Sequence, residues 1–169
     1  MSSKKKPKES LRNDLEKEIM YGFKEEFLQQ DVKLAGLYKV DRGKLITSWI
    51  ESGFLDTSDI KRPLLKRALS RIGVVIYRRS SPRDKPYIIF LVDTVAKRAA
   101  ADSANEAAKI FKHLFPGTRA VFVAIDKEPD KLKPSRFKFL DEIFIGKDLE
   151  EAWDKVYDYL KQVFYPEEK

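Results

Sequence analysis

Several chemistries are missing from this chain of 169 residues. It contains no cysteine, so disulfide frameworks, thiolate zinc sites and cysteine nucleophiles are impossible. Gly73, Gly117 and Gly146 stand alone, and the sequence has no glycine-rich phosphate loop. No apolar run approaches the ~18 residues that span a bilayer. Residues 1–8 are lysine-rich with no hydrophobic stretch behind them, so we expect no secretory signal and no membrane partner.

Amide side chains are also scarce. Asn and Gln together number five, while charged residues make up 36% of the chain, a pattern typical of thermophilic proteins. Hydrophobic residues reach 43% and include eleven Phe, which excludes wholesale disorder and provides material for one core. We therefore expect a soluble, cytoplasmic protein from a thermophilic source.

Positive charge is concentrated in residues 61–98. This segment holds eleven basic residues and two acids and is therefore +9, whereas the whole chain is +7 and the remainder −2. A localised basic block is typical of a surface that binds a polyanion, most often nucleic acid. We expect phosphate-backbone contacts, with DNA favoured. The candidate contact residues are Arg62, Lys66, Arg67, Arg71, Arg78, Arg79, Arg83, Lys85 and Arg98.

Apolar periodicity predicts helices over residues 11–27, 43–52 and 62–72. The third helix starts with Pro63 in its first turn, where proline is tolerated. Its basic residues are spaced as like-charge i,i+4 pairs, Arg62 with Lys66 and Arg67 with Arg71, and such pairs are destabilising unless an anion neutralises them.

Strand patterns begin at residue 74. The segments 74–79 and 87–92 predict a strand hairpin, and the wholly apolar 87–92 and 120–125 predict strands that are covered on both faces. Ser103 with Glu106 predicts a capped helix between them, which indicates a parallel βαβ crossover. A strand over 142–145 and a C-terminal helix capped by Asp148 follow.

The expected fold class is therefore α/β, with a helical N-terminal third followed by a mixed sheet. We expect a flexible basic arm over residues 1–9 and a single domain over 10–169. Within that domain, residues 10–72 are expected to be mainly helical and 73–169 to form the sheet and its helices. The three N-terminal helices and the hairpin resemble a winged helix–turn–helix, in which Arg67 and Arg71 would contact DNA and Arg83 and Lys85 an adjacent phosphate.

Two carboxylates follow predicted strands. Asp93 closes the 87–92 strand and Asp126 closes the 120–125 strand. If the strands are parallel, both side chains emerge at the same edge of the sheet, where ligands of open α/β sheets bind. Two acids could hold Mg²⁺, which would activate water against a phosphodiester. The alternative is that each Asp only initiates a turn.

The order helix, antiparallel strand pair, helix, strand over residues 70–126 resembles the core of the restriction-endonuclease-like nucleases. In that family an acid and, two residues later, a lysine lie near the end of the second strand. Asp93 matches the acid, Val95 occupies the lysine position, and Lys97 would have to substitute. The family's other aspartate has no counterpart in residues 71–75. The resemblance implies a degenerate member that keeps the nucleic-acid-binding fold and has lost or relocated its chemistry.

The loop over residues 127–138 also combines basic and aromatic side chains. Exposed rings there could stack on single-stranded bases. The alternative, which we favour, is that the loop covers Phe137 and Phe139 and that their role is structural. The leading interpretation is a non-catalytic nucleic-acid-binding protein without a cofactor, such as an accessory subunit in DNA or RNA metabolism. The alternatives are a Mg²⁺-dependent nuclease that uses Asp93 and Lys97, and a subunit whose basic surface docks an acidic protein.

Overall fold

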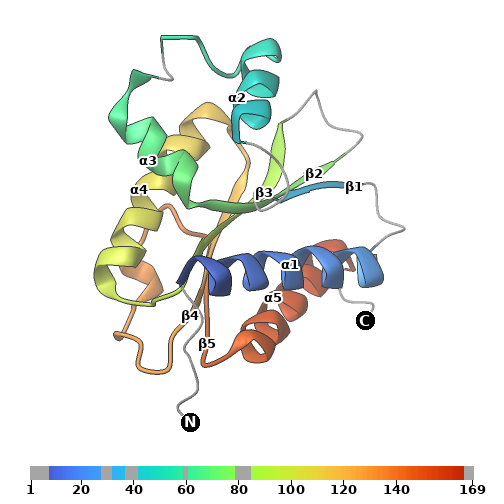
Figure 1. Ribbon diagram of the computed structural model, residues 1–169, viewed down its shortest axis with the longest axis vertical. Helices are drawn as coiled ribbons and strands as arrows, with labels where there is room; N and C mark the ends of the chain where they lie inside the picture. Colours follow the sequence, from blue (N-terminus) through green and yellow to red (C-terminus); the bar gives the residue numbers. More distant parts are fainter. Residues whose placement is uncertain (1–7, 28–31, 37–41, 59–60, 79–84, 166–169) are drawn as a thin grey trace.

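A computed structural model describes residues 8–27, 32–36, 42–58, 61–78 and 85–165. The strands within these ranges form one five-stranded sheet with the order β1-β2-β3-β4-β5, flanked by helices on both faces (Figure 1). The helices are α1 (Lys8–Phe27), α2 (Arg42–Glu51), α3 (Pro63–Arg71), α4 (Arg98–Leu114) and α5 (Leu149–Phe164). The strands are β1 (Val32–Gly36), β2 (Ile72–Arg78), β3 (Pro86–Asp93), β4 (Arg119–Ile125) and β5 (Glu142–Gly146).

The sheet is mixed, which confirms the predicted fold class. β2 pairs antiparallel with both β1 and β3, whereas β3, β4 and β5 pair in parallel. The helix α4 connects β3 to β4 and makes the predicted parallel crossover. As a result, β3, β4 and β5 end at one edge of the sheet, here called the carboxyl edge.

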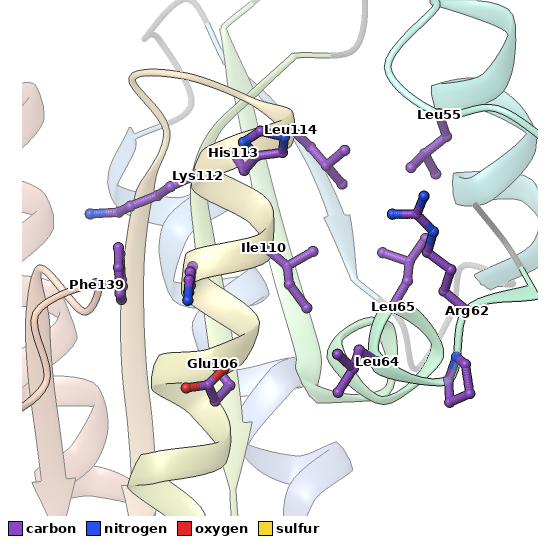
Figure 2. A pocket seen from close by; sticks show the side chains of 12 residues that line it. Leu55, Arg62, Leu64, Leu65, Glu106, Ile110, Lys112, His113, Leu114 and Phe139 are labelled. Atoms are coloured by element: carbon purple, nitrogen blue, oxygen red, sulfur yellow. The ribbon is translucent and has the colours of Figure 1, made fainter.

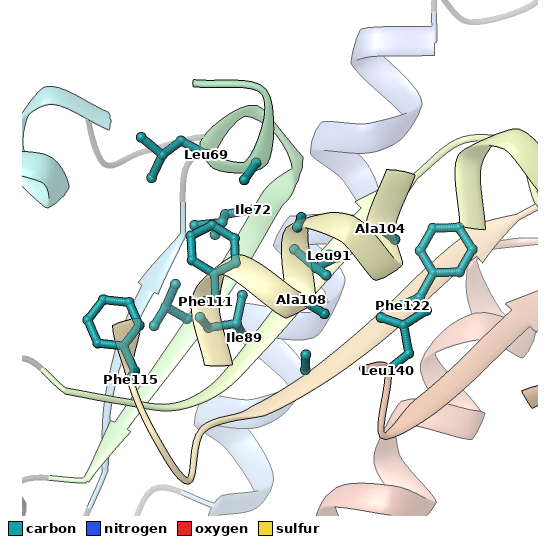
Figure 3. Packing of buried hydrophobic residues seen from close by; sticks show 14 of the residues in the cluster. Leu69, Ile72, Ile89, Leu91, Ala104, Ala108, Phe111, Phe115, Phe122 and Leu140 are labelled. Carbon is teal, nitrogen blue, oxygen red and sulfur yellow. The ribbon is translucent and has the colours of Figure 1, made fainter. Parts of the chain in front are cut away.

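Both faces of β3 are buried, as its unbroken apolar sequence predicts. Ile89 and Leu91 pack into a core beneath α2, α3 and α4, part of which is shown in Figure 3. Ile88 and Phe90, on the other face, join a second core beneath α1 and α5. Successive side chains of a strand point to opposite faces, so a central strand between two cores needs apolar residues at every position.

The N-terminal third is rich in helix, as expected, but the segment before α2 also contains the edge strand β1, which the sequence does not predict. The expected winged helix–turn–helix is wrong, because α1 packs against the core opposite to that of α2 and α3 and the three helices do not assemble. The strands β2 and β3 each lie between two neighbours in the sheet, and the hairpin tip over residues 79–84 lies outside the described residues.

The start of α4 also differs from the expectation. Ser103 lies inside the helix, which begins at Arg98, so Ser103 and Glu106 do not form its N-terminal cap. The run Ala99–Ala100–Ala101 favours extension of the helix toward its N-terminus. Asp130 instead accepts a hydrogen bond from the Arg98 N–H at 2.8 Å. At the last helix the prediction is confirmed, since the Asp148 side chain accepts from the Glu151 N–H at 2.8 Å.

Residues 1–7 of the expected arm lie outside the described residues, and α1 begins at Lys8. Across the described ranges, every helix is too short or too polar to cross a bilayer.

Candidate nucleic-acid interface

The helix α3 carries a basic outer surface. Its apolar residues Leu65, Ala68 and Leu69 are buried against the sheet and α4, which leaves Lys66 and Arg67 exposed on the outer side. None of its nine residues is acidic. One member of each predicted like-charge pair is therefore displayed to solvent, and the helix has no carboxylate to offset these two charges.

Arg71, at the end of α3, has a different environment. Its guanidinium is half-buried and donates to the Asp93 carboxylate at 2.6 Å. The other Asp93 oxygen accepts from the Thr94 N–H at 2.7 Å, which shapes the turn after β3. Arg71 thus holds the helix to the carboxyl edge of the sheet, and its charge is partly neutralised before any ligand approaches.

Asp126 is engaged in a similar way. Its carboxylate accepts from the N–H groups of Ala96 at 2.8 Å and Glu128 at 3.0 Å, and it lies 3.7 Å from the Lys97 ammonium. Burial raises the pKa of this carboxyl, but the two backbone donors and Lys97 outweigh burial and leave its pKa below the ordinary value. Asp126 therefore ties the segment after β3 to the segment after β4.

The predicted carboxylate pair does reach one edge of the sheet. Asp93 is paired in register with Ala124 on the parallel strand β4, two residues before Asp126. Lys97, the candidate catalytic lysine, contacts Asp126 and also donates to the Glu128 carbonyl. A cation that bound both carboxylates would compete with Arg71 and Lys97. Within the described ranges, no cluster of three or more His, Asp or Glu side chains is arranged to hold a metal.

The remaining candidates do not join α3 in one patch. Lys85 lies beside Gly117, at the end of the sheet opposite Asp93, and Arg98 is exposed at the start of α4. Arg71 comes directly before β2 and Arg78 is its last residue, so the strand separates them by roughly 20 Å at its usual rise per residue. Arg79 and Arg83 lie outside the described residues, and only the backbone of Arg78 is described. The basic segment of the sequence therefore divides between two ends of the sheet.

An apolar groove that the sequence does not reveal runs between α3 and α4 (Figure 2). It has a volume of about 810 Å³. Leu64 and Leu65 of α3 lie on one side, and Ile110 and Leu114 of α4 lie on the other. Leu64 is 63% exposed, an unusual position for a large apolar side chain on a short basic helix. Arg62, Lys109, Lys112 and His113 stand around the groove, with Glu106 as an acid among them.

An ion pair on α1, which the sequence does not reveal, supports the C-terminal end of α3 from the opposite face of the sheet. Glu16 of α1 is buried and lies 3.4 Å from Arg12. Arg12 donates to the carbonyls of Ser70 at 2.7 Å and Ile72 at 3.1 Å, at the junction of α3 and β2. This contact anchors α1 to the C-terminal end of the basic helix. The apolar periodicity of α1 gives no signal for it, because it depends on a partner about sixty residues away.

The aromatic residues of the loop over 127–138 are not displayed for stacking. Phe137 is buried in the core, and Phe139 is partly covered with the Lys109 ammonium 5.9 Å from its ring centre. The favoured alternative, rings covered by the loop, is confirmed for Phe137, whereas Phe139 is half-buried and lines the groove.

The chain matches no protein-family model, and comparison with curated proteins and with solved structures finds no similar protein. A functional interpretation therefore rests on the residues and geometry above.

Proposed function

We propose that this protein binds nucleic acid, with DNA favoured, through phosphate-backbone contacts and without catalysis of its own. The observation that carries the proposal is the outer face of α3, where Lys66 and Arg67 are exposed on a helix that contains no acid. Cations held this way attract a polyanion and gain further from the release of its counterions. A role as an accessory subunit in DNA or RNA metabolism fits such a surface.

From the order α3, β2, β3, α4, β4 we infer a resemblance to the core of the restriction-endonuclease-like nucleases. This order supports the choice of nucleic acid as the partner. The departures at the motif, with Val95 in the lysine position, favour a binder over an enzyme.

Fluorescence anisotropy with labelled single- and double-stranded DNA and RNA tests the proposal directly. The double variant Lys66→Gln/Arg67→Gln removes two exposed charges without disturbing a described ion pair. The variant Lys24→Gln/Lys44→Gln is the matched control, because it lowers the net charge equally at exposed positions on α1 and α2. We expect weaker binding from the α3 variant than from the control. Equal losses in the two variants would mean that net charge, and not α3, governs binding.

A Mg²⁺-dependent nuclease is the second candidate, favoured by the position of Asp93 and Asp126 at one edge of the sheet. The same samples, incubated with Mg²⁺ and run on a denaturing gel, decide it. Fragments that appear with wild type and disappear with Asp93→Ala, while binding remains, would replace the binding proposal with the nuclease.

An acidic protein partner is the third candidate. The groove beside α3 gives it a surface, since apolar side chains line the groove and basic side chains stand around it. No retention on DNA or RNA at about 0.15 M salt, where exposed charges are screened beyond roughly 8 Å, would favour this partner.

A further inference from the structure

A second, smaller cavity with a cationic lining lies at the carboxyl edge. It has a volume of about 220 Å³ and is lined by Arg98, Lys131, Leu132, Lys133, Arg136 and Phe137. We call it the cationic pocket. Four of these six residues are basic, and three of the four lie outside the basic segment 61–98 of the sequence.

The pocket is built on fixed backbone. The loop after β4 is joined to the start of α4 by the hydrogen bond from the Asp130 N–H to the Ala96 carbonyl, at 2.9 Å. It is joined again by the bond from the Arg98 N–H to the Asp130 carboxylate. The 3₁₀ helix η2 (Pro134–Arg136) then carries Arg136, and the buried Phe137 ring anchors it to the core. The basic side chains therefore project from a loop whose backbone is fixed by these hydrogen bonds and by the buried Phe137 ring.

Within the described part of the chain, the side chains of Arg98, Lys131, Lys133 and Arg136 form no ion pair. The nearest acid by contact is Asp130, and its carboxylate binds the backbone N–H of Arg98 rather than the guanidinium. Asp126, another acid at this end, is already engaged by Ala96, Glu128 and Lys97. Four cations around one cavity repel one another, and Arg98 also stands at the first position of a helix, where a positive charge is unfavourable.

We propose that the cationic pocket binds a phosphate group. Two arginines can contact phosphate oxygens in a bidentate manner, and two lysines add point charges. In the context of the proposed function, on which this step rests, the group is a phosphate of the bound strand. The pocket then supplies a second contact, at the carboxyl edge and separate from the outer face of α3.

Titration of ¹⁵N-labelled protein with inorganic phosphate, with chloride exchanged to keep the ionic strength constant, tests the pocket without any nucleic acid. We expect saturable shifts of the amides around Arg98 and across residues 131–137. The variant Lys133→Gln/Arg136→Gln should weaken phosphate binding by about tenfold or more. The control Lys24→Gln/Lys44→Gln should leave it unchanged. Shifts that do not saturate, or that persist in the pocket variant, would overturn the proposal.

Oligonucleotides with and without a 5′-phosphate then identify the source of the group. If the pocket variant loses affinity for both oligonucleotides, the bound group is an internal phosphodiester. If it loses affinity only for the phosphorylated strand, the bound group is the terminal phosphate. If the wild type binds phosphate in the pocket but no oligonucleotide, the pocket stands and the proposed nucleic-acid function fails. If the wild type binds oligonucleotides through α3 but shows no phosphate site, the function stands and the pocket fails.

Discussion

The Arg71 guanidinium lies 2.6 Å from the Asp93 carboxylate and so joins the last residue of the basic helix α3 to the last residue of the central strand β3. Both side chains are partly buried, which places the pair between an exposed and a fully buried ion pair. The sequence predicts Arg71 to contact nucleic acid and Asp93 to bind a metal. In the structure the two side chains instead bind each other and fix α3 on the sheet.

Breaking this ion pair should destabilise the protein. We expect Asp93→Asn and Arg71→Gln each to lower the free energy of unfolding by about 1–2 kcal/mol, between the values of exposed and buried pairs. The double variant should cost less than the sum of the two single variants, because either substitution alone removes the shared interaction. Urea unfolding of wild type, the two single variants and the double variant measures the coupling energy between Arg71 and Asp93. Strictly additive losses would contradict the predicted interaction.

The pH dependence of stability should report on Asp126. Burial raises its pKa, but the N–H groups of Ala96 and Glu128 and the Lys97 ammonium outweigh this effect, so the pKa lies below the ordinary value of 3.8. The resulting stabilisation is complete above the unfolded-state pKa and is lost as pH falls through the lower folded-state pKa. Asp126→Asn should therefore be less stable than wild type near about pH 6, with a deficit that shrinks toward about pH 2. Urea unfolding across this range tests it, and a deficit independent of pH would contradict the explanation.

The two candidate caps of α4 should behave differently when removed. Asp130→Ala removes the acceptor of the Arg98 N–H and should cost about 0.5–2 kcal/mol of stability, as other lost helix caps do. Ser103→Ala lies inside the helix and should be neutral or slightly stabilising, because alanine is the better helix former. Thermal unfolding of both variants compares them. A larger loss of stability from Ser103→Ala than from Asp130→Ala would support the Ser103 cap predicted from the sequence.

These caps show what sequence patterns can and cannot predict here. Where the determinant is local, as in the apolar run of β3 or the Asp148 cap of α5, the prediction is confirmed. The strand β1 has the sequence VKLAG, whose Lys, Ala and Gly are poor strand formers, and it forms by pairing with the distant β2. Likewise, the α4 cap comes from another loop, and no local signal identifies it.

The candidate site was predictable in composition but not in arrangement. Charge counting located Lys66 and Arg67 correctly on an exposed helix face. It could not separate them from Arg71, because an ion pair with Asp93 depends on the strand that follows. Charge counting also could not predict that Arg98 lines one pocket with Lys133 and Arg136. These residues come together only because the parallel crossover returns the chain to the same edge of the sheet.

The contact between α1 and α5 depends on a residue without a side chain. A Cβ on Gly22 would lie 2.6 Å from Cε2 of Trp153, inside van der Waals contact. We therefore expect Gly22→Ala to destabilise the protein by about 1–3 kcal/mol through overpacking, although alanine is the better helix former. Trp153→Leu should relieve the clash, so that Gly22→Ala costs less in that background. Chemical denaturation of the four proteins tests this, and an equal cost in both backgrounds would contradict it.

The salt dependence of DNA binding should identify which cations contact phosphate. For duplex DNA, each neutralised phosphate contributes about 0.9 to the slope of log affinity against log salt concentration. Replacing both exposed cations of α3, in Lys66→Gln/Arg67→Gln, should therefore lower the slope by nearly two, whereas Lys24→Gln/Lys44→Gln should leave it unchanged. Arg71→Gln alone should lower the slope by less than one, because Asp93 already neutralises part of its charge. Anisotropy titrations at several salt concentrations give these slopes, and an unchanged slope for the α3 variant would exclude Lys66 and Arg67 as phosphate contacts.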